Sequence, residues 1–192
     1  MRGIAVLKKL LAGFALRAGF ALAASVATPA LADDIEVIDA RLSAAEEGAI
    51  LAADFSFELG PRLAEVVTNG VPLYFVVEFE LNRPRWYWWD ERVAAATRTY
   101  RLSYHALTQQ YRVALNSYVQ SFGSLPAALA AMSGVRGWRV IEPDQVKAGS
   151  EYEAQVRMRL DAAQLPKPFQ VTAITNRDWT LQAEWKRFRF VP

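Results

Sequence analysis

The sequence predicts a mainly β protein, an antiparallel β-sandwich of immunoglobulin-like type with one or two short helices. Apolar and polar side chains alternate along several segments, which is the two-residue period of half-buried strands. Turn residues recur about every ten residues, and only two segments show helical spacing. About seven or eight strands are expected, and a small closed barrel is the alternative architecture.

The first 32 residues have the parts of an export signal. A positively charged start precedes an Ala- and Leu-rich stretch, and Ala30-Leu31-Ala32 matches the small-x-small pattern that signal peptidase cleaves. Arg17 interrupts the apolar stretch, which leaves it too short or too charged for a spanning helix of about 20 residues. We therefore expect cleavage after Ala32, with an uncleaved anchor as the alternative. Residues 33–192 are then a single periplasmic domain without stable membrane insertion.

The basic character of the whole chain comes from this leader. The sequence pI is about 9.0, but four cations and no acids lie in the leader, which leaves 18 Lys and Arg against 20 Asp and Glu in the rest. The four leader cations are Arg2, Lys8, Lys9 and Arg17. The charge balance therefore predicts no nucleic-acid partner. The chain has no Cys, which excludes Cys catalysis, Cys-based zinc sites and disulfides.

The strands are predicted from alternation in the order of the chain. The expected strand segments are 35–42, 49–58, 71–81, 100–106, 111–115, 151–161 and 179–190. The first two form a hairpin through Ala44–Gly48, and a turn near 108–110 joins the strands on either side of it. In the last segment the apolar side switches after Trp185, which predicts a β-bulge.

Two short helices interrupt the strands. Pro61 suits a first helical position, and Asn69-Gly70 supplies the end of that helix. Ser124 can cap a second helix over 125–133. The stretches 143–150 and 163–168 are expected to be loops.

The run from Arg83 to Glu91 is the most unusual stretch, because it holds three of the six Trp residues. Strand alternation would place Trp86 and Trp88 on one face and Tyr87 and Trp89 on the other. A sandwich sheet buries one face, so either the segment leaves the sheet or two large aromatics reach the surface. Three interpretations stay open: packing at the end of the sandwich, a partner-binding surface, and a platform for sugars. The candidate partner-binding residues are Arg85, Tyr87, Trp89, Asp90 and Glu91.

Several runs of residues together resemble the bacterial family DUF4390, over essentially all of 35–190. The runs are Leu81–Glu91, Tyr100–Thr108, Gln110–Val113, Ser121-Phe122, Ser124-Leu125, Ala127–Leu129 and Gly137–Val140. The resemblance implies an exported protein without an assigned activity. Members are often encoded beside a membrane sensor histidine kinase of the nitrogen-regulation type, which suggests that kinase as a partner. The resemblance supplies no catalytic, cofactor-binding or metal-binding residue.

No catalytic constellation stands out. His105 is the only His, and its strand parity places it at the surface beside Ser103, without a nucleophile-elbow sequence. One His and no Cys make a zinc site unexpected. Glu78 and Glu80 share the polar face of a strand, where solvated acids are expected, and Asp90 lies beside the aromatic cluster.

We therefore expect a non-catalytic periplasmic interaction protein that needs no cofactor. Its partner is expected to be an envelope protein, with the sensor kinase as the candidate implied by the resemblance. The alternatives are a glycan-binding module or carboxylate-dependent cell-wall hydrolase built on Trp88 and Asp90, and a structural assembly factor.

Overall fold

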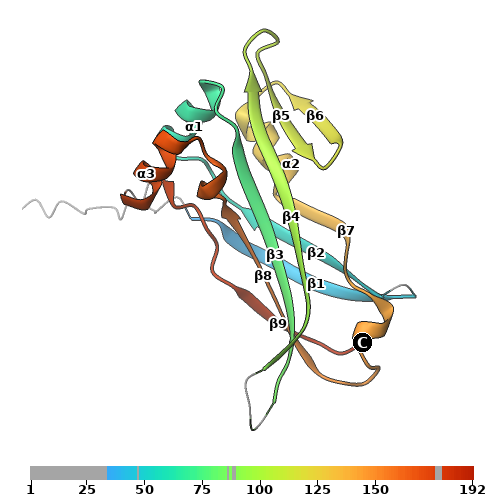
Figure 1. The fold of residues 1–192 in the computed structure, drawn as a ribbon. Coiled ribbons are helices and arrows are strands. Elements are labelled where there is room, and N and C mark those ends of the chain that lie inside the picture. Colours follow the sequence, from blue (N-terminus) through green and yellow to red (C-terminus); the bar gives the residue numbers. More distant parts are fainter. Residues whose placement is uncertain (1–33, 47, 86, 88–89, 176–178) are drawn as a thin grey trace, which may run out of the picture. The chain divides into compact units, whose positions relative to one another are not determined.

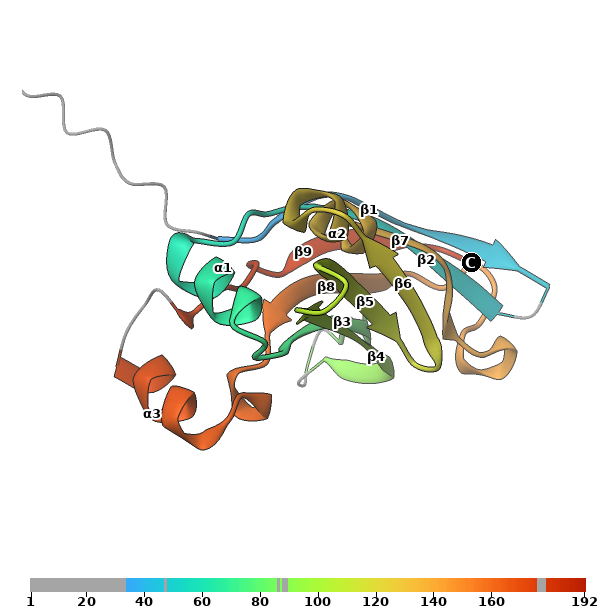
Figure 2. The same ribbon diagram turned by 90° about the horizontal axis from the view of Figure 1, so that it is seen from above.

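Two antiparallel β-sheets face each other, which confirms the predicted mainly β, sandwich-like class (Figure 1). The computed structural model describes residues 34–192 except 47, 86, 88–89 and 176–178. The chain divides into two units, Met1–Ala30 and Leu31–Pro192, and all described residues belong to the second. Figure 2 shows the two layers from above, with β1, β2 and β7 in one layer and β8, β3 and β4 in the other.

The small sheet has three strands in the order β1-β2-β7. Its strands are β1 (Glu36–Ala45), β2 (Gly48–Ser56) and β7 (Gly134–Ile141). The antiparallel pairing of β1 with β2 confirms the predicted first hairpin. In β2, Leu51, Ala53 and Phe55 point into the core, as the alternation predicted. We expected no strand at β7. Its glycines and arginines hide the alternation, and the pairing with β2 is what makes it a strand.

The large sheet has six strands in the order β6-β5-β4-β3-β8-β9. Its strands are β3 (Leu73–Arg83), β4 (Glu91–His105), β5 (Gln110–Leu115), β6 (Tyr118–Phe122), β8 (Tyr152–Leu160) and β9 (Lys186–Phe190). The predicted segments 71–81, 100–106, 111–115 and 151–161 are confirmed within β3, β4, β5 and β8. The short strand β6 was not expected. The described part of the chain therefore has nine strands rather than seven or eight.

The inward face of β3 forms the centre of the core. Its side chains are each at most 1% exposed: Leu73, Phe75, Val77, Phe79 and Leu81. The neighbouring antiparallel strand β8 adds a second row of buried side chains beside it: Tyr152, Ala154, Val156 and Met158. Burying a large apolar side chain contributes about 1.5–3 kcal/mol, so these rows hold the two sheets together.

Both predicted helices are confirmed. α1 (Pro61–Thr68) begins with its proline and buries Leu63, Val66 and Val67. α2 (Leu125–Met132) begins after Ser124, whose hydroxyl accepts a hydrogen bond from the Ala127 N–H at 3.4 Å.

A third α-helix corrects the expectation of one or two helices. α3 (Lys167–Thr175) begins inside the stretch 163–168, which we expected to be a loop because of its two prolines. Pro168 lies in the first turn of the helix, where a missing N–H costs no internal hydrogen bond. The Phe169 ring packs against Trp179 at 5.3 Å between centroids, which anchors the helix. The short 3₁₀ turn Pro143–Gln145 lies in the predicted loop 143–150, and a second one, Ala162–Gln164, begins one residue before the predicted loop 163–168.

The predicted strand 179–190 is wrong in its first half. Trp179, Leu181 and Ala183 are buried in alternation as expected, but the ladder with β8 is reduced there to a bridge between Arg159 and Gln182. The regular strand begins only at Lys186. Alternating burial of side chains indicates an extended backbone. It does not indicate whether a neighbouring strand forms a regular ladder of backbone hydrogen bonds with it.

Gly48 should resist substitution, because it opens β2 with a φ of +104°. A Cβ at this position would also collide with the backbone carbonyl oxygen of Ile141 at the end of β7. We expect Gly48→Ala to lower the free energy of unfolding by about 1–3 kcal/mol, measured from urea denaturation. Gly123→Ala is the matched control, since open space surrounds that position. Equal denaturation midpoints for both variants would contradict the prediction.

Candidate functional site

The predicted site lies in the turn between β3 and β4, where the chain leaves the sheet. Arg83 and Glu91 are the last register partners of the two strands, and Figure 1 shows β3 and β4 running together to this end. Pro84 follows directly and has no N–H to continue the ladder. The described residues between Arg83 and Glu91, namely Pro84, Arg85, Tyr87 and Asp90, lie outside the strands. Trp86, Trp88 and the predicted site residue Trp89 lie outside the described residues.

Ion pairs and a hydrogen bond bring three of the predicted residues, Arg85, Asp90 and Glu91, together at the base of this turn. The Glu91 carboxylate contacts the guanidinium groups of Arg85 at 2.6 Å and Arg83 at 3.1 Å. The Arg85 backbone N–H donates to the Asp90 carboxylate at 3.3 Å. The hydrogen bond from Arg85 lowers the pKa of Glu91, and the charges of both arginines add to this effect. Arg83, Arg85 and Glu91 thus form a charged clamp at the base of the turn.

Tyr152 ties this clamp to the core. Its side chain is buried, and its hydroxyl accepts hydrogen bonds from the Lys147 backbone N–H at 2.9 Å and from the Arg83 guanidinium at 3.3 Å. The Arg83 guanidinium also lies over the Tyr152 ring, 5.5 Å from its centroid. Burial raises the pKa of Tyr152, but the hydrogen bonds from Lys147 and Arg83 outweigh it and lower the pKa overall.

The sequence interpretation missed Arg83 and Tyr152 as parts of the site. A signal for Tyr152 was present, since it falls on the inward row of a predicted strand and a buried phenol needs a hydrogen-bond partner. Nothing local identified Arg83 as that partner, because the two residues are far apart in sequence.

Tyr87 is presented to solvent beyond the clamp. It is 65% exposed and is one of the few large apolar or aromatic side chains so exposed among the described residues. The side chains of Arg85 and Glu91 are 37% and 39% exposed. Tyr and Arg are residue types that protein interfaces favour, and here the carboxylate of Glu91 holds the arginine in place.

A second polar cluster lies on the outer face of the large sheet, and it corrects one expectation. Glu78 is not a solvated acid: its side chain is only 17% exposed and contacts Arg157 at 2.6 Å and Arg159 at 2.9 Å. Glu80 accepts a hydrogen bond from Gln155 at 2.8 Å and pairs with Arg92 at 3.1 Å.

This outer cluster borders a shallow pocket between β3, β4 and Trp185. The Arg157 guanidinium lies over the Trp185 ring, 4.4 Å from its centroid. Burial opposes ionisation of Glu78, but the hydrogen bonds from Arg157 and Arg159 outweigh it and lower the pKa of Glu78. A carboxyl group held ionised in this way is poorly suited to serve as a general acid.

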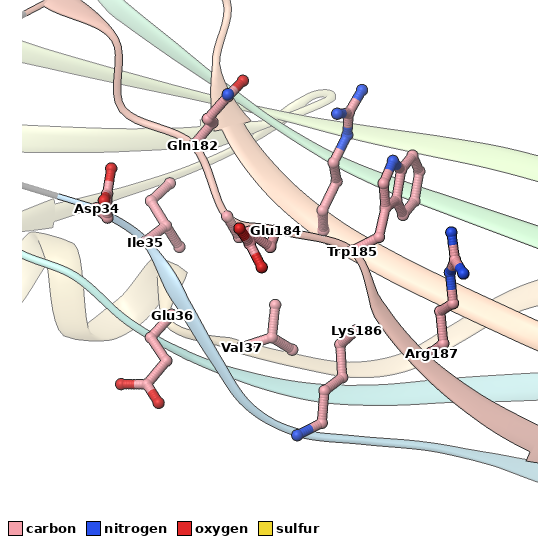
Figure 3. A pocket seen from close by; sticks show the side chains of 11 residues that line it. Asp34, Ile35, Glu36, Val37, Gln182, Glu184, Trp185, Lys186 and Arg187 are labelled. Carbon is pink, nitrogen blue, oxygen red and sulfur yellow. The ribbon is translucent and has the colours of Figure 1, made fainter. Parts of the chain in front are cut away.

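A larger groove opens where the edge strands β1 and β9 separate (Figure 3). It has a volume of about 980 Å³ and is lined mainly by residues 34–37 and 182–187. Ile35 and Val37 point from the β1 side toward the opposite segment, which carries Glu184 and Lys186. No sequence signal marked this groove, because its two walls come from opposite ends of the described chain. None of the predicted site residues lines it.

His105 serves the β4–β5 turn. Its Nδ1 accepts a hydrogen bond from the Thr108 N–H at 3.3 Å, and its ring is half-buried rather than fully at the surface. Among the described residues, no three His, Asp or Glu side chains gather as a metal ion would require. None of the helices in the described part of the chain is long and apolar enough to cross a membrane.

Comparison with known protein families gives a match over nearly the whole described chain. A family model described as "Domain of unknown function (DUF4390)" matches residues 32–189. No curated protein and no solved structure matches the chain.

The ion pairs of Glu78 should make stability depend on pH. The pKa of Glu78 in the folded chain lies below its ordinary value of 4.5, so ionised Glu78 stabilises the fold above that pH. This contribution is lost as the pH falls through the lowered pKa. We expect Glu78→Gln to be about 1–2 kcal/mol less stable than the native chain at pH 7, with a difference that shrinks below about pH 4.

Urea denaturation at a series of pH values measures this difference. Glu58→Gln is the control, because Glu58 is an exposed acid outside this cluster. A stability difference for Glu78→Gln that stayed constant from neutral to acidic pH would rule out the ionised carboxylate as its source.

Proposed function

Because the chain belongs to the DUF4390 family, whose description assigns no activity, we propose a function from the geometry. The protein is a non-catalytic periplasmic interaction protein that binds an envelope partner through the β3–β4 turn. The observation that carries this proposal is the exposed Tyr87 above the charged clamp of Arg83, Arg85 and Glu91.

The clamp supports binding by fixing the base of the turn, where Arg85 and Glu91 lie, before a partner arrives. Arg83 connects the turn to the buried Tyr152, and Arg85 connects its two arms through Glu91 and Asp90. A recognition loop whose two ends are fixed in advance loses less conformational entropy on binding than one with free ends. The partner should therefore present an apolar pocket for Tyr87 with polar groups at its rim.

The export leader predicted for residues 1–32 supports the periplasmic location. An envelope protein with an extracytoplasmic domain is the partner class that this location makes available. The sensor histidine kinase implied by the family resemblance is our candidate within that class.

The hydrolase alternative has weaker support. A glycosidase needs one carboxyl group protonated at working pH, whereas Glu78 is held ionised by two arginines. Asp90 accepts a backbone hydrogen bond within its own turn. Glycan binding without catalysis would still be compatible with the exposed aromatic ring, and the experiment below distinguishes it.

Capture from cross-linked native envelopes tests the proposal. We expect the native chain to enrich an envelope protein identified by mass spectrometry, and Tyr87→Ser to recover at least about tenfold less of it. The melting temperature of Tyr87→Ser should change by less than about 2 °C, because the side chain is exposed.

Leu107→Ser is the matched control, since Leu107 is 92% exposed in the β4–β5 turn, away from the β3–β4 turn. It should capture as much partner as the native chain. Equal capture by Tyr87→Ser and the native chain would contradict the proposal. Retention of peptidoglycan in place of a protein would favour the glycan-binding alternative.

A further inference from the structure

Strand β6 forms an edge of the large sheet that nothing in its own sequence protects. Residues Tyr118–Ser121 are all exposed, including Tyr118 at 67% and Val119 at 55%. No Asp, Glu, Lys or Arg occurs between Arg112 and Arg136. Soluble proteins usually protect an edge strand with charges, prolines or bulges, because its free N–H and C=O groups pair readily with another strand.

The other three sheet edges in the described part of the chain carry such protection. β1 has a register shift around the exposed Ile38 and carries Glu36, Asp39 and Arg41. β9 carries Lys186, Arg187 and Arg189. β7 carries Arg136 and Arg139, and Gly137 within it has a φ of +60°. The contrast singles out β6 as an edge suited to pairing.

The hairpin geometry leaves the outer hydrogen-bonding groups of β6 free to pair. Leu115 and Tyr118 are register partners across the turn Asn116-Ser117. The closing pair of a two-residue hairpin exchanges hydrogen bonds, and such pairs alternate along an antiparallel ladder. The backbone N–H and C=O groups of Val119 and Ser121 therefore point away from β5.

We propose that β6 pairs antiparallel with β6 of a second copy of this chain, with Gln120 at the two-fold axis. In this register Val119 faces Ser121 of the other copy, and their outward groups form the new ladder. Tyr118 then lies opposite Phe122 of the other copy, and aromatic cross-strand pairs are favourable. An interface of this kind uses the same patch on both subunits and closes on itself.

The charge distribution favours a second copy as the occupant. Pairing β6 with itself brings no like charges together, because the strand and its flanking turns are uncharged. The same operation at β9 would juxtapose cations, which costs stability. α2 extends the uncharged patch, since it packs beside β5 and β6. Its exposed residues are Pro126, Ala127, Ala130 and Ala131.

Sedimentation velocity of the full chain over a range of concentrations tests the pairing. We expect a concentration-dependent dimer for the native chain, and at least about tenfold weaker association for Val119→Lys. Ile38→Lys is the matched control, because Ile38 is 53% exposed on a different edge. It should dimerise like the native chain. Circular dichroism should show native secondary structure in both variants.

A second substitution tests the register. In the double variant Val119→Lys/Ser121→Glu, the new Lys of one copy faces the new Glu of the other. The double variant should therefore associate again at low salt, and its association should weaken at high salt. A native chain that stays monomeric at all concentrations would overturn the proposal. So would a dimer that Val119→Lys leaves unchanged, or a native chain that pairs only with a different protein.

Discussion

The burial of β3 is the constraint on which the rest of the structure depends. This strand lies between β4 and β8 in the large sheet, paired with β4 along its whole length and with β8 from Phe75 to Asn82. Its inward row, from Leu73 to Leu81, is at most 1% exposed. A shift of one residue in its register would turn that row toward solvent, so the register is strongly fixed. This packing places every side chain on the outer face of β3, and also Arg83 at the end of the strand.

The polar features of the molecule follow from the same strand. Because the inward row is fixed, Glu78 and Glu80 must point outward, where Arg157, Arg159 and Arg92 neutralise them. The ionised Glu78 then links β3 to β8 on the face opposite the core. At the end of the strand, Arg83 reaches back to Tyr152 of β8. The candidate site is therefore an extension of the β3–β8 pairing rather than an independent loop.

The sequence predicted those parts of the structure whose signal is local. Alternation identified β3, β5 and β8, and cap residues such as Pro61 and Ser124 placed two helices. β7 was missed because pairing with the distant strand β2 defines it. β6 was missed because it is short and exposed along nearly its whole length, so no buried row alternates along it. The ion pair between Arg85 and Glu91 could be anticipated, because the two residues lie close together in the sequence. The contact between Arg83 and Tyr152 could not, since it depends on the register of two strands that are distant in sequence.

The two surfaces that we propose lie at opposite ends of β4. The β3–β4 turn adjoins its first residue, Glu91, whereas β5 and β6 extend the sheet from its last part, Tyr100–His105. The part of β4 from Glu91 to Tyr100 spans roughly 30 Å at about 3.3 Å per residue, so pairing through β6 would leave both turns accessible. A dimer would then present two recognition turns at once, and two linked sites bind a paired partner more tightly than either does alone. A partner that is itself a two-fold dimer would match such an arrangement of turns by symmetry.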